Sequence, residues 1–165
     1  MPAVTIRRAG PADRATILAF VGALQEHERT VDPSKLTAAE AAEAYLAESE
    51  EAAARNQGAF YLAEQDGRAL GFVGCWLDSD ADVTIDVAWR TFGYISDIYV
   101  VPEARGTGLA TRLYQRAENH CAALGMKRMR IGALGRNPVA LRAHAKFGFR
   151  PLYTIFDKPI GPRRD

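Results

Sequence analysis

Two glycines and an arginine stand where an apolar run gives way to a helical pattern. Residues 94–101 form a β-branched, apolar run that predicts a strand, and from Leu109 onward apolar residues recur at helical spacing. The turn between them, at 105–108, reads Arg-Gly-Thr-Gly. The first N–H groups of a helix have no partner within the helix and carry partial positive charge, and glycine lets a ligand approach the backbone closely. The turn therefore predicts a binding site for an anion such as a phosphate.

The common nucleotide-binding motifs do not fit this turn. The dinucleotide fingerprint needs a third glycine where Thr111 stands, and an acidic residue roughly 20 residues on, where the chain is basic at 127–130. A P-loop needs Gly-Lys followed by Ser or Thr, and the turn lacks that sequence. The turn must therefore be interpreted together with other parts of the chain.

A family resemblance supplies that context. Residues 101–110, Val-Pro-Glu-Ala-Arg-Gly-Thr-Gly-Leu-Ala, resemble the acyl-CoA-binding signature of the GNAT N-acetyltransferases, whose core is Gln/Arg-x-x-Gly-x-Gly/Ala. A second block at 137–149, from Asn-Pro-Val-Ala-Leu to Phe-Gly-Phe, resembles the later motif of that family. Two motifs in the right order are more specific than either alone. The resemblance covers nearly the whole chain and is strongest over 94–158.

The resemblance implies acetyl-CoA as the acyl donor. Backbone N–H groups of the turn would hold its pyrophosphate, and a strand edge whose neighbour splays away would pair with its pantetheine arm, as a peptide adds to a sheet edge. Asn137 is expected to contact that arm, although a helix N-cap before Pro138 also explains it. The residues expected to bind acetyl-CoA are Ile98, Tyr99, Val100, Arg105, Gly106, Thr107, Gly108, Leu109, Ala110 and Asn137.

Two residues are candidates for proton transfer. Where the family often has a tyrosine that protonates the departing CoA thiolate, this chain has His144. A helix C-terminus favours the charged imidazolium, which could serve as the general acid. Alternatively, His144 is a core histidine whose two ring nitrogens both have hydrogen-bond partners. Some relatives carry a Glu-Asp pair in the central strand, with the glutamate as base, and here the pair is Ser96-Asp97. Asp97 is therefore either the base or a structural carboxylate.

Glu26 and Glu28 follow the first expected helix, where the acceptor site of the family is usually bounded. They are candidates for binding the acceptor and, like water alone, alternatives to Asp97 as base; a solvated helix end explains them equally well. The acidic residues at 78, 80, 82 and 86 favour a cationic small amine if they rim the cleft, but they also fit a solvated loop.

The remaining pattern predicts the elements that position these residues. Strands are expected at 4–8, 59–64, 69–77, 94–101, 128–133 and 152–158, with a short extra strand at 83–89, and helices around 17–24 and at 37–55, 109–124 and 138–147. The order β-α-α-β-β-β-α-β-α-β predicts an α+β fold, a mixed sheet flanked by helices. The resemblance implies that this is the acyl-CoA N-acyltransferase fold of the GNAT family.

Composition limits the remaining possibilities. A chain of 165 residues with 48% hydrophobic content predicts one domain over 1–165, and a net charge of +1 indicates neither a nucleic-acid nor a membrane partner. Cys75 and Cys121 are far apart, so they predict no disulfide framework and no metal site. No apolar run reaches the ~18 residues of a membrane span, so we expect a cytoplasmic protein. A homodimer is possible as a common habit of the family.

These observations predict an N-acetyltransferase. A primary amine, of a small molecule in preference to a protein, would attack the thioester of acetyl-CoA directly, because neither cysteine lies in the motifs to form an acyl-enzyme. Two other hypotheses remain open. One is a non-catalytic acyl-CoA sensor, which the missing glutamate and the histidine at 144 favour. The other is an interaction domain that binds no CoA.

Overall fold

The computed structural model describes residues 3–161 and contains one five-stranded sheet. The strands follow one another in the order β1 (Thr5–Arg8), β2 (Ala59–Gln65), β3 (Arg68–Ser79), β4 (Thr91–Val100) and β5 (Met129–Ile131). Strands β1 to β4 are antiparallel neighbours, whereas β5 runs parallel to β4. The predicted mixed sheet with flanking helices is confirmed.

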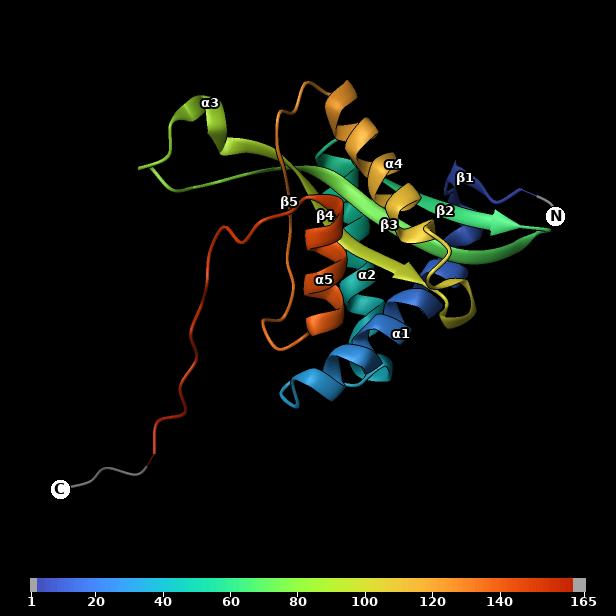
Figure 1. Cartoon of the computed structure of the whole chain (residues 1–165), viewed down its shortest axis with the longest axis horizontal. Helices are drawn as coiled ribbons and strands as arrows, with labels where there is room; N and C mark the ends of the chain where they lie inside the picture. The colour runs from blue at the N-terminus through green and yellow to red at the C-terminus, as the bar shows by residue number, and fades with distance from the viewer. Residues whose placement is uncertain (1–2, 162–165) are drawn as a thin grey trace.

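Helices cover both faces of this sheet. They are α1 (Arg14–Val31), α2 (Ala38–Arg55), the short α3 (Val87–Arg90), α4 (Leu109–Ala123) and α5 (Pro138–Phe147), with 3-10 turns at Pro11–Asp13 and Pro102–Ala104. Figure 1 shows α1 and α2 side by side on one face, with α4 on the other face and α5 next to it. None of the helices within residues 3–161 is long and apolar enough to cross a membrane.

Local sequence signals set the ends of these helices. The Thr37 side chain accepts a hydrogen bond from the Glu40 N–H while the Glu40 carboxylate accepts one from the Thr37 N–H, which is the capping box that the sequence predicts for α2. Helix α5 begins after Asn137 and ends at Gly148, whose φ of 104° lies in the left-handed region that favours glycine.

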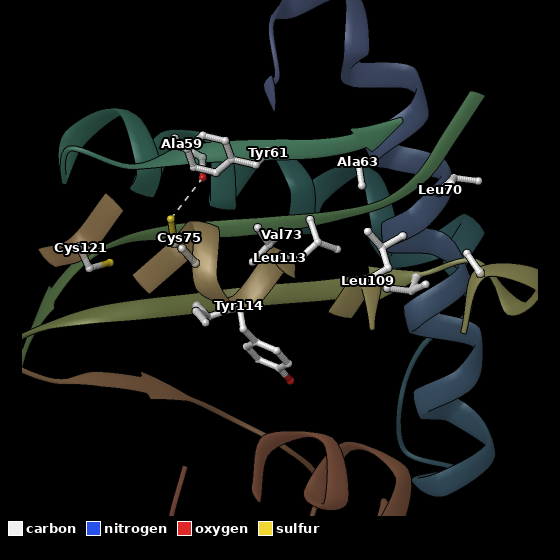
Figure 2. Packing of buried hydrophobic residues seen from close by; sticks show 14 residues of the cluster. Ala59, Tyr61, Ala63, Leu70, Val73, Cys75, Leu109, Leu113, Tyr114 and Cys121 are labelled. Carbon is white, nitrogen blue, oxygen red and sulfur yellow. Dashed lines mark hydrogen bonds between the residues drawn. The ribbon is translucent and has the colours of Figure 1, made fainter. Parts of the chain in front are cut away.

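Two apolar cores lie on opposite sides of the sheet. The α4 side buries Val73, Ile95 and Leu113 completely, and Figure 2 shows the side chains of α4 packed against β2 and β3. On the other side, Leu46 and Phe72 lie in a second core beneath α1 and α2. Burial of both faces fixes which residues of the central strands point toward each pair of helices.

Strand β4 is irregular at two places that matter for function. In its pairing with β3, Ile95 lies opposite Cys75 and Asp97 opposite Gly74, so Ser96 is one extra residue, a β-bulge. Its parallel pairing with β5 ends at Ile95. From Ser96 to Val100 the β4 edge on that side has no neighbouring strand within the described chain. This is the splay that the family resemblance implied.

Two predicted strands are wrong. Residues 150–161 form no strand and project away from the sheet in Figure 1, with Ile155 93% exposed. A stretch rich in β-branched and aromatic residues predicts an extended backbone, but a strand also needs a partner, and β5 is only three residues long. Residues 83–89 form no strand either, because the Asp86 carboxylate accepts from the Ala88 N–H at 2.8 Å and caps the short helix α3.

Candidate active site

The glycine turn leads directly into α4. Gly106 and Gly108 have φ values of 77° and 85°, a left-handed conformation that residues with a Cβ rarely adopt. A Cβ placed on either glycine would meet no atom within 4 Å, so the space beside the turn is open. Among the described residues, no carbonyl accepts a hydrogen bond from the N–H groups of 106–108. The turn therefore fits a pyrophosphate held by backbone N–H groups.

Side chains around the turn hold its shape. Arg105 Nε donates to the Val100 carbonyl at 3.1 Å and its guanidinium lies 5.9 Å from the Tyr99 ring centroid. Thr107 Oγ1 donates to the Ala104 carbonyl at 2.8 Å. Arg105 thus ties the turn to the last residue of β4, so the anion site and the open strand edge form one continuous surface.

Asn137 is a helix cap in the structure. Its Oδ1 accepts from the Ala140 N–H at 3.2 Å, and the residue is 7% exposed. This confirms the simpler of the two interpretations, the N-cap of α5. The second, contact with a pantetheine arm, stays a prediction.

A cavity of about 260 Å³ lies between α1, α2 and the splayed ends of β4 and β5. Apolar wall residues come from α1 and from the segment after β5, and polar groups from α1, α2, their connection and β4 converge in it. Among the latter are Glu28, Lys35, Tyr45, Tyr94 and Asp97. An apolar cavity with a few convergent polar groups is the usual form of a small-molecule site.

Asp97 is a partly buried carboxylate of this cavity. Burial raises its pKa to about 6, the negative charge of Glu28 acts in the same direction, and hydrogen bonding opposes the rise. Both carboxylate oxygens accept from the Tyr45 hydroxyl, at 3.1 Å each. Burial and the neighbouring Asp97 charge raise the pKa of Tyr45, so the phenol keeps its proton and acts as a donor. A carboxylate with a pKa near 6 is mostly ionised at pH 7 and can accept a proton from an amine.

The two glutamates on α1 lie in different environments. Glu28 lines the cavity and pairs with Lys35, with 2.8 Å between Oε2 and Nζ. Glu26 is not among the cavity-lining residues. Its carboxylate accepts from the Ala38 N–H at 2.6 Å and pairs with Arg29, and the Ala38 hydrogen bond lowers its pKa. The structure thus brings Glu28 together with Asp97 and places Glu26 at the start of α2.

The acidic residues of the β3–β4 connection do not line this cavity. Asp80 binds the Arg130 guanidinium, with Nη1 to Oδ1 at 2.9 Å. Asp82 accepts from the Thr84 hydroxyl at 2.7 Å, and Asp86 caps α3. These carboxylates stabilise their own connection.

His144 lies in an aromatic cluster between α4 and α5. Its Nδ1 is 2.6 Å from the Tyr114 hydroxyl, and the rings of Tyr114 and Phe149 lie edge-on to it. Figure 2 shows the Tyr114 hydroxyl pointing away from the sheet, toward α5. Burial lowers the pKa of His144, and a backbone hydrogen bond with Gly132 opposes the shift. The effect of burial on the pKa of His144 is larger than the opposite effect expected of a helix C-terminus. The imidazole is therefore mostly neutral at pH 7.

Sequence reasoning missed Tyr45, Lys35 and Tyr114. Tyr45 is 52 residues from Asp97 in the chain and Tyr114 is 30 from His144, so no local spacing connects either pair. For Tyr45, the only signal was its place on the expected helix at 37–55.

Comparison with known proteins identifies the family and the fold. The acetyltransferase (GNAT) family model matches residues 22–149. A mycothiol acetyltransferase of Sanguibacter keddieii is 35% identical over 92 residues, 56% of this chain, and the match spans 28% of that relative's length. The fold matches a putative acetyl transferase from Pyrococcus furiosus with a TM-score of 0.72, 23% identity and coverage of 96% and 100% of the two chains. A predicted acetyltransferase from Clostridium acetobutylicum, solved with acetyl-CoA, matches with a TM-score of 0.70, 18% identity and coverage of 95% and 96%. The chain therefore belongs to the GNAT family of acetyltransferases.

Proposed function

We propose that this protein transfers the acetyl group of acetyl-CoA to a primary amine, of a small molecule in preference to a protein. One observation carries the proposal. The unpaired edge of β4 runs from the cavity, at Ser96 and Asp97, to the glycine turn beyond Val100. A donor bound along this edge has its phosphate end at the turn and its acyl end at the partly buried carboxylate.

The donor half of the site is made of backbone. The N–H groups of 106–108 would bind the pyrophosphate, and the backbone groups between Ile98 and Val100 that face the open edge would pair with the pantetheine amides. Asn137, whose N–H donates to the carbonyl of the cavity-lining Leu134, is the proposed side-chain contact for the pantetheine arm. Acetyl-CoA supplies the activated thioester, and no acyl-enzyme is required.

The acceptor half of the site is the cavity. Asp97 would take a proton from the acceptor ammonium, directly or through one water, and Glu28 would attract the cationic acceptor by its charge. Holding amine and thioester together can lower the barrier by about 7 kcal/mol or more, so positioning provides most of the rate.

His144 is the proposed proton donor to the departing thiolate. Its lowered pKa has two opposing effects: fewer molecules carry the imidazolium at pH 7, but each one is a stronger acid. Tyr114, at 2.6 Å from Nδ1, holds the ring in place for this transfer.

The test is acetyl-CoA binding by calorimetry, followed by thiol release against a panel of small amines. Binding with turnover of an amine supports the proposal. Binding without turnover of any amine would favour the non-catalytic sensor, and no binding would refute the central role of the glycine turn.

A further inference from the structure

An amine of the protein itself already lies in the proposed acceptor cavity. Lys35, in the connection between α1 and α2, lines the same cavity as Asp97. Its Nζ is 2.8 Å from Glu28 Oε2, and the two side chains are 37% and 34% exposed. Lys35 thus places an amine of the protein at the wall of the proposed acceptor cavity, paired with Glu28.

The connection that carries Lys35 is fixed by side chains of α1. Gln25 Nε2 donates to the Leu36 carbonyl at 2.7 Å, and Arg29 Nε donates to the Lys35 carbonyl at 3.2 Å. Glu26 binds the next helix through the Ala38 N–H. The backbone on both sides of Lys35 is thus held by α1, and only the side chain is free to move within the cavity.

The other lysines lie in quite different places. The chain has four lysines, and the other three, at 127, 146 and 158, are exposed and away from this cavity. Lys35 is the least exposed of the four. Spontaneous acetylation by a reactive thioester favours exposed amines, so it would modify Lys35 more slowly than the others.

We propose that Lys35 is a site of self-acetylation, an inference that rests on the proposed function. Asp97 takes a proton from the Lys35 ammonium, and the neutral Nζ attacks the thioester carbonyl carbon of bound acetyl-CoA. The N–C bond forms, the C–S bond breaks, and CoA leaves as a thiolate that takes up a proton. The products are Nε-acetyllysine at position 35 and CoA.

This modification changes the acceptor site. Acetylation removes the positive charge that neutralises Glu28, because an amide carries no charge at neutral pH. Glu28 is then an unpaired carboxylate at the mouth of the cavity, which favours a cationic acceptor. Before self-acetylation, Glu28 pairs with the Lys35 ammonium. After it, Glu28 is available to attract the ammonium of an acceptor.

The first experiment incubates the full-length protein with acetyl-CoA alone and follows each lysine by peptide mass spectrometry. We expect Lys35 to be acetylated at least about tenfold faster than the other three lysines, because its amine is tethered at a millimolar effective concentration. The rate per molecule should not depend on protein concentration. Asp97→Asn should reduce the rate at Lys35 to that of the others. Equal rates at all four lysines in the unsubstituted protein would overturn the inference.

A second experiment measures proximity without turnover. In a Lys35→Cys variant, the introduced thiol can displace bromide from bromoacetyl-CoA and form a thioether, which the intact mass reveals. Lys127→Cys is the matched control, since its position is exposed and remote from the cavity, and the native Cys75 and Cys121 are both buried. We expect faster labelling at position 35. Labelling no faster than at 127 would contradict the inference.

The two proposals can fail separately. If acetyl-CoA binds and an added amine is acetylated while Lys35 stays unmodified, the proposed function stands and the self-acetylation inference is wrong. If acetyl-CoA does not bind at all, both are wrong.

Discussion

The Tyr45 hydroxyl lies 3.1 Å from each carboxylate oxygen of Asp97, and this contact joins α2 to the bulge of β4. Through this hydrogen bond, Tyr45 in the cavity wall donates to the carboxylate of Asp97, the proposed base. Burial raises the pKa of Asp97 to about 6, and the phenol opposes that rise because it stabilises the charged form. The pair therefore sets the pH range in which the carboxylate can accept a proton.

Replacing Tyr45 with phenylalanine should move the acidic limb of the pH–rate profile upward. A hydrogen bond to a charged group is worth about 1.5–3 kcal/mol, so its loss should raise the pKa of Asp97 by about one to two units. The measurement is kcat/KM for the amine against pH. Tyr94→Phe is the control, since Tyr94 lines the same cavity without a hydrogen bond to Asp97. An equal shift in both variants, or none in Tyr45→Phe, would contradict this assignment.

Asp97→Asn should abolish most of the activity and stabilise the fold above pH 6. The folded-state pKa of about 6 exceeds the ordinary value of 3.8, so the folded state binds more protons than the unfolded state between these values. Stability therefore falls as pH rises from about 4 to 6 and then stays level. We expect the asparagine variant to gain about 1–3 kcal/mol at pH 7.5 and nothing at pH 3.5. Denaturant unfolding at both pH values checks this, and a loss of stability at pH 7.5 would refute it.

Gly108→Val should weaken acetyl-CoA binding by at least about tenfold, because the side chain would disturb the N–H groups that face the pyrophosphate. Gly67→Val offers a matched control. Gly67 has a φ of 76°, and a Cβ there also meets nothing within 4 Å, but it lies in the β2–β3 hairpin. Both variants should lose about 1–2 kcal/mol of stability through backbone strain. Calorimetry should then find reduced affinity only at position 108, and equal affinities would argue against the pyrophosphate site.

His144→Phe should lower kcat by about 10²-fold or more while leaving KM for acetyl-CoA unchanged, as loss of a general acid does. The variant also leaves the Tyr114 hydroxyl without its partner, at a cost of about 1–3 kcal/mol. Adding Tyr114→Phe should restore much of that stability but none of the activity. Full turnover with an unchanged pH profile in His144→Phe would show that the histidine is structural.

The parts of the site that the sequence predicts are those set by local chemistry. The glycines at 106 and 108 are needed by a single turn, and Thr37 with Glu40 forms a cap within four residues, so both are visible in a short stretch of sequence. The Tyr45–Asp97 contact depends on how α2 packs on the sheet, because the two residues are 52 positions apart in the chain. Residues 152–158 show the converse limit, since their composition favours an extended backbone but says nothing of the neighbouring strand that a sheet requires.

The bulge at Ser96 decides more than local geometry. Side chains alternate along a strand, so Ile95, Asp97 and Tyr99 would otherwise share one face. The extra residue reverses the alternation, and Ile95, Ile98 and Val100 all pack in the α4 core while Asp97 and Tyr99 turn toward α1 and α2. Without the bulge, with Ser96 in regular pairing, Asp97 would share the face of Ile95, and its carboxylate would turn into the hydrocarbon core beneath α4. In this strand, one extra residue lets Ile95 and Ile98 pack in the α4 core while Asp97, which lies between them, faces the cavity.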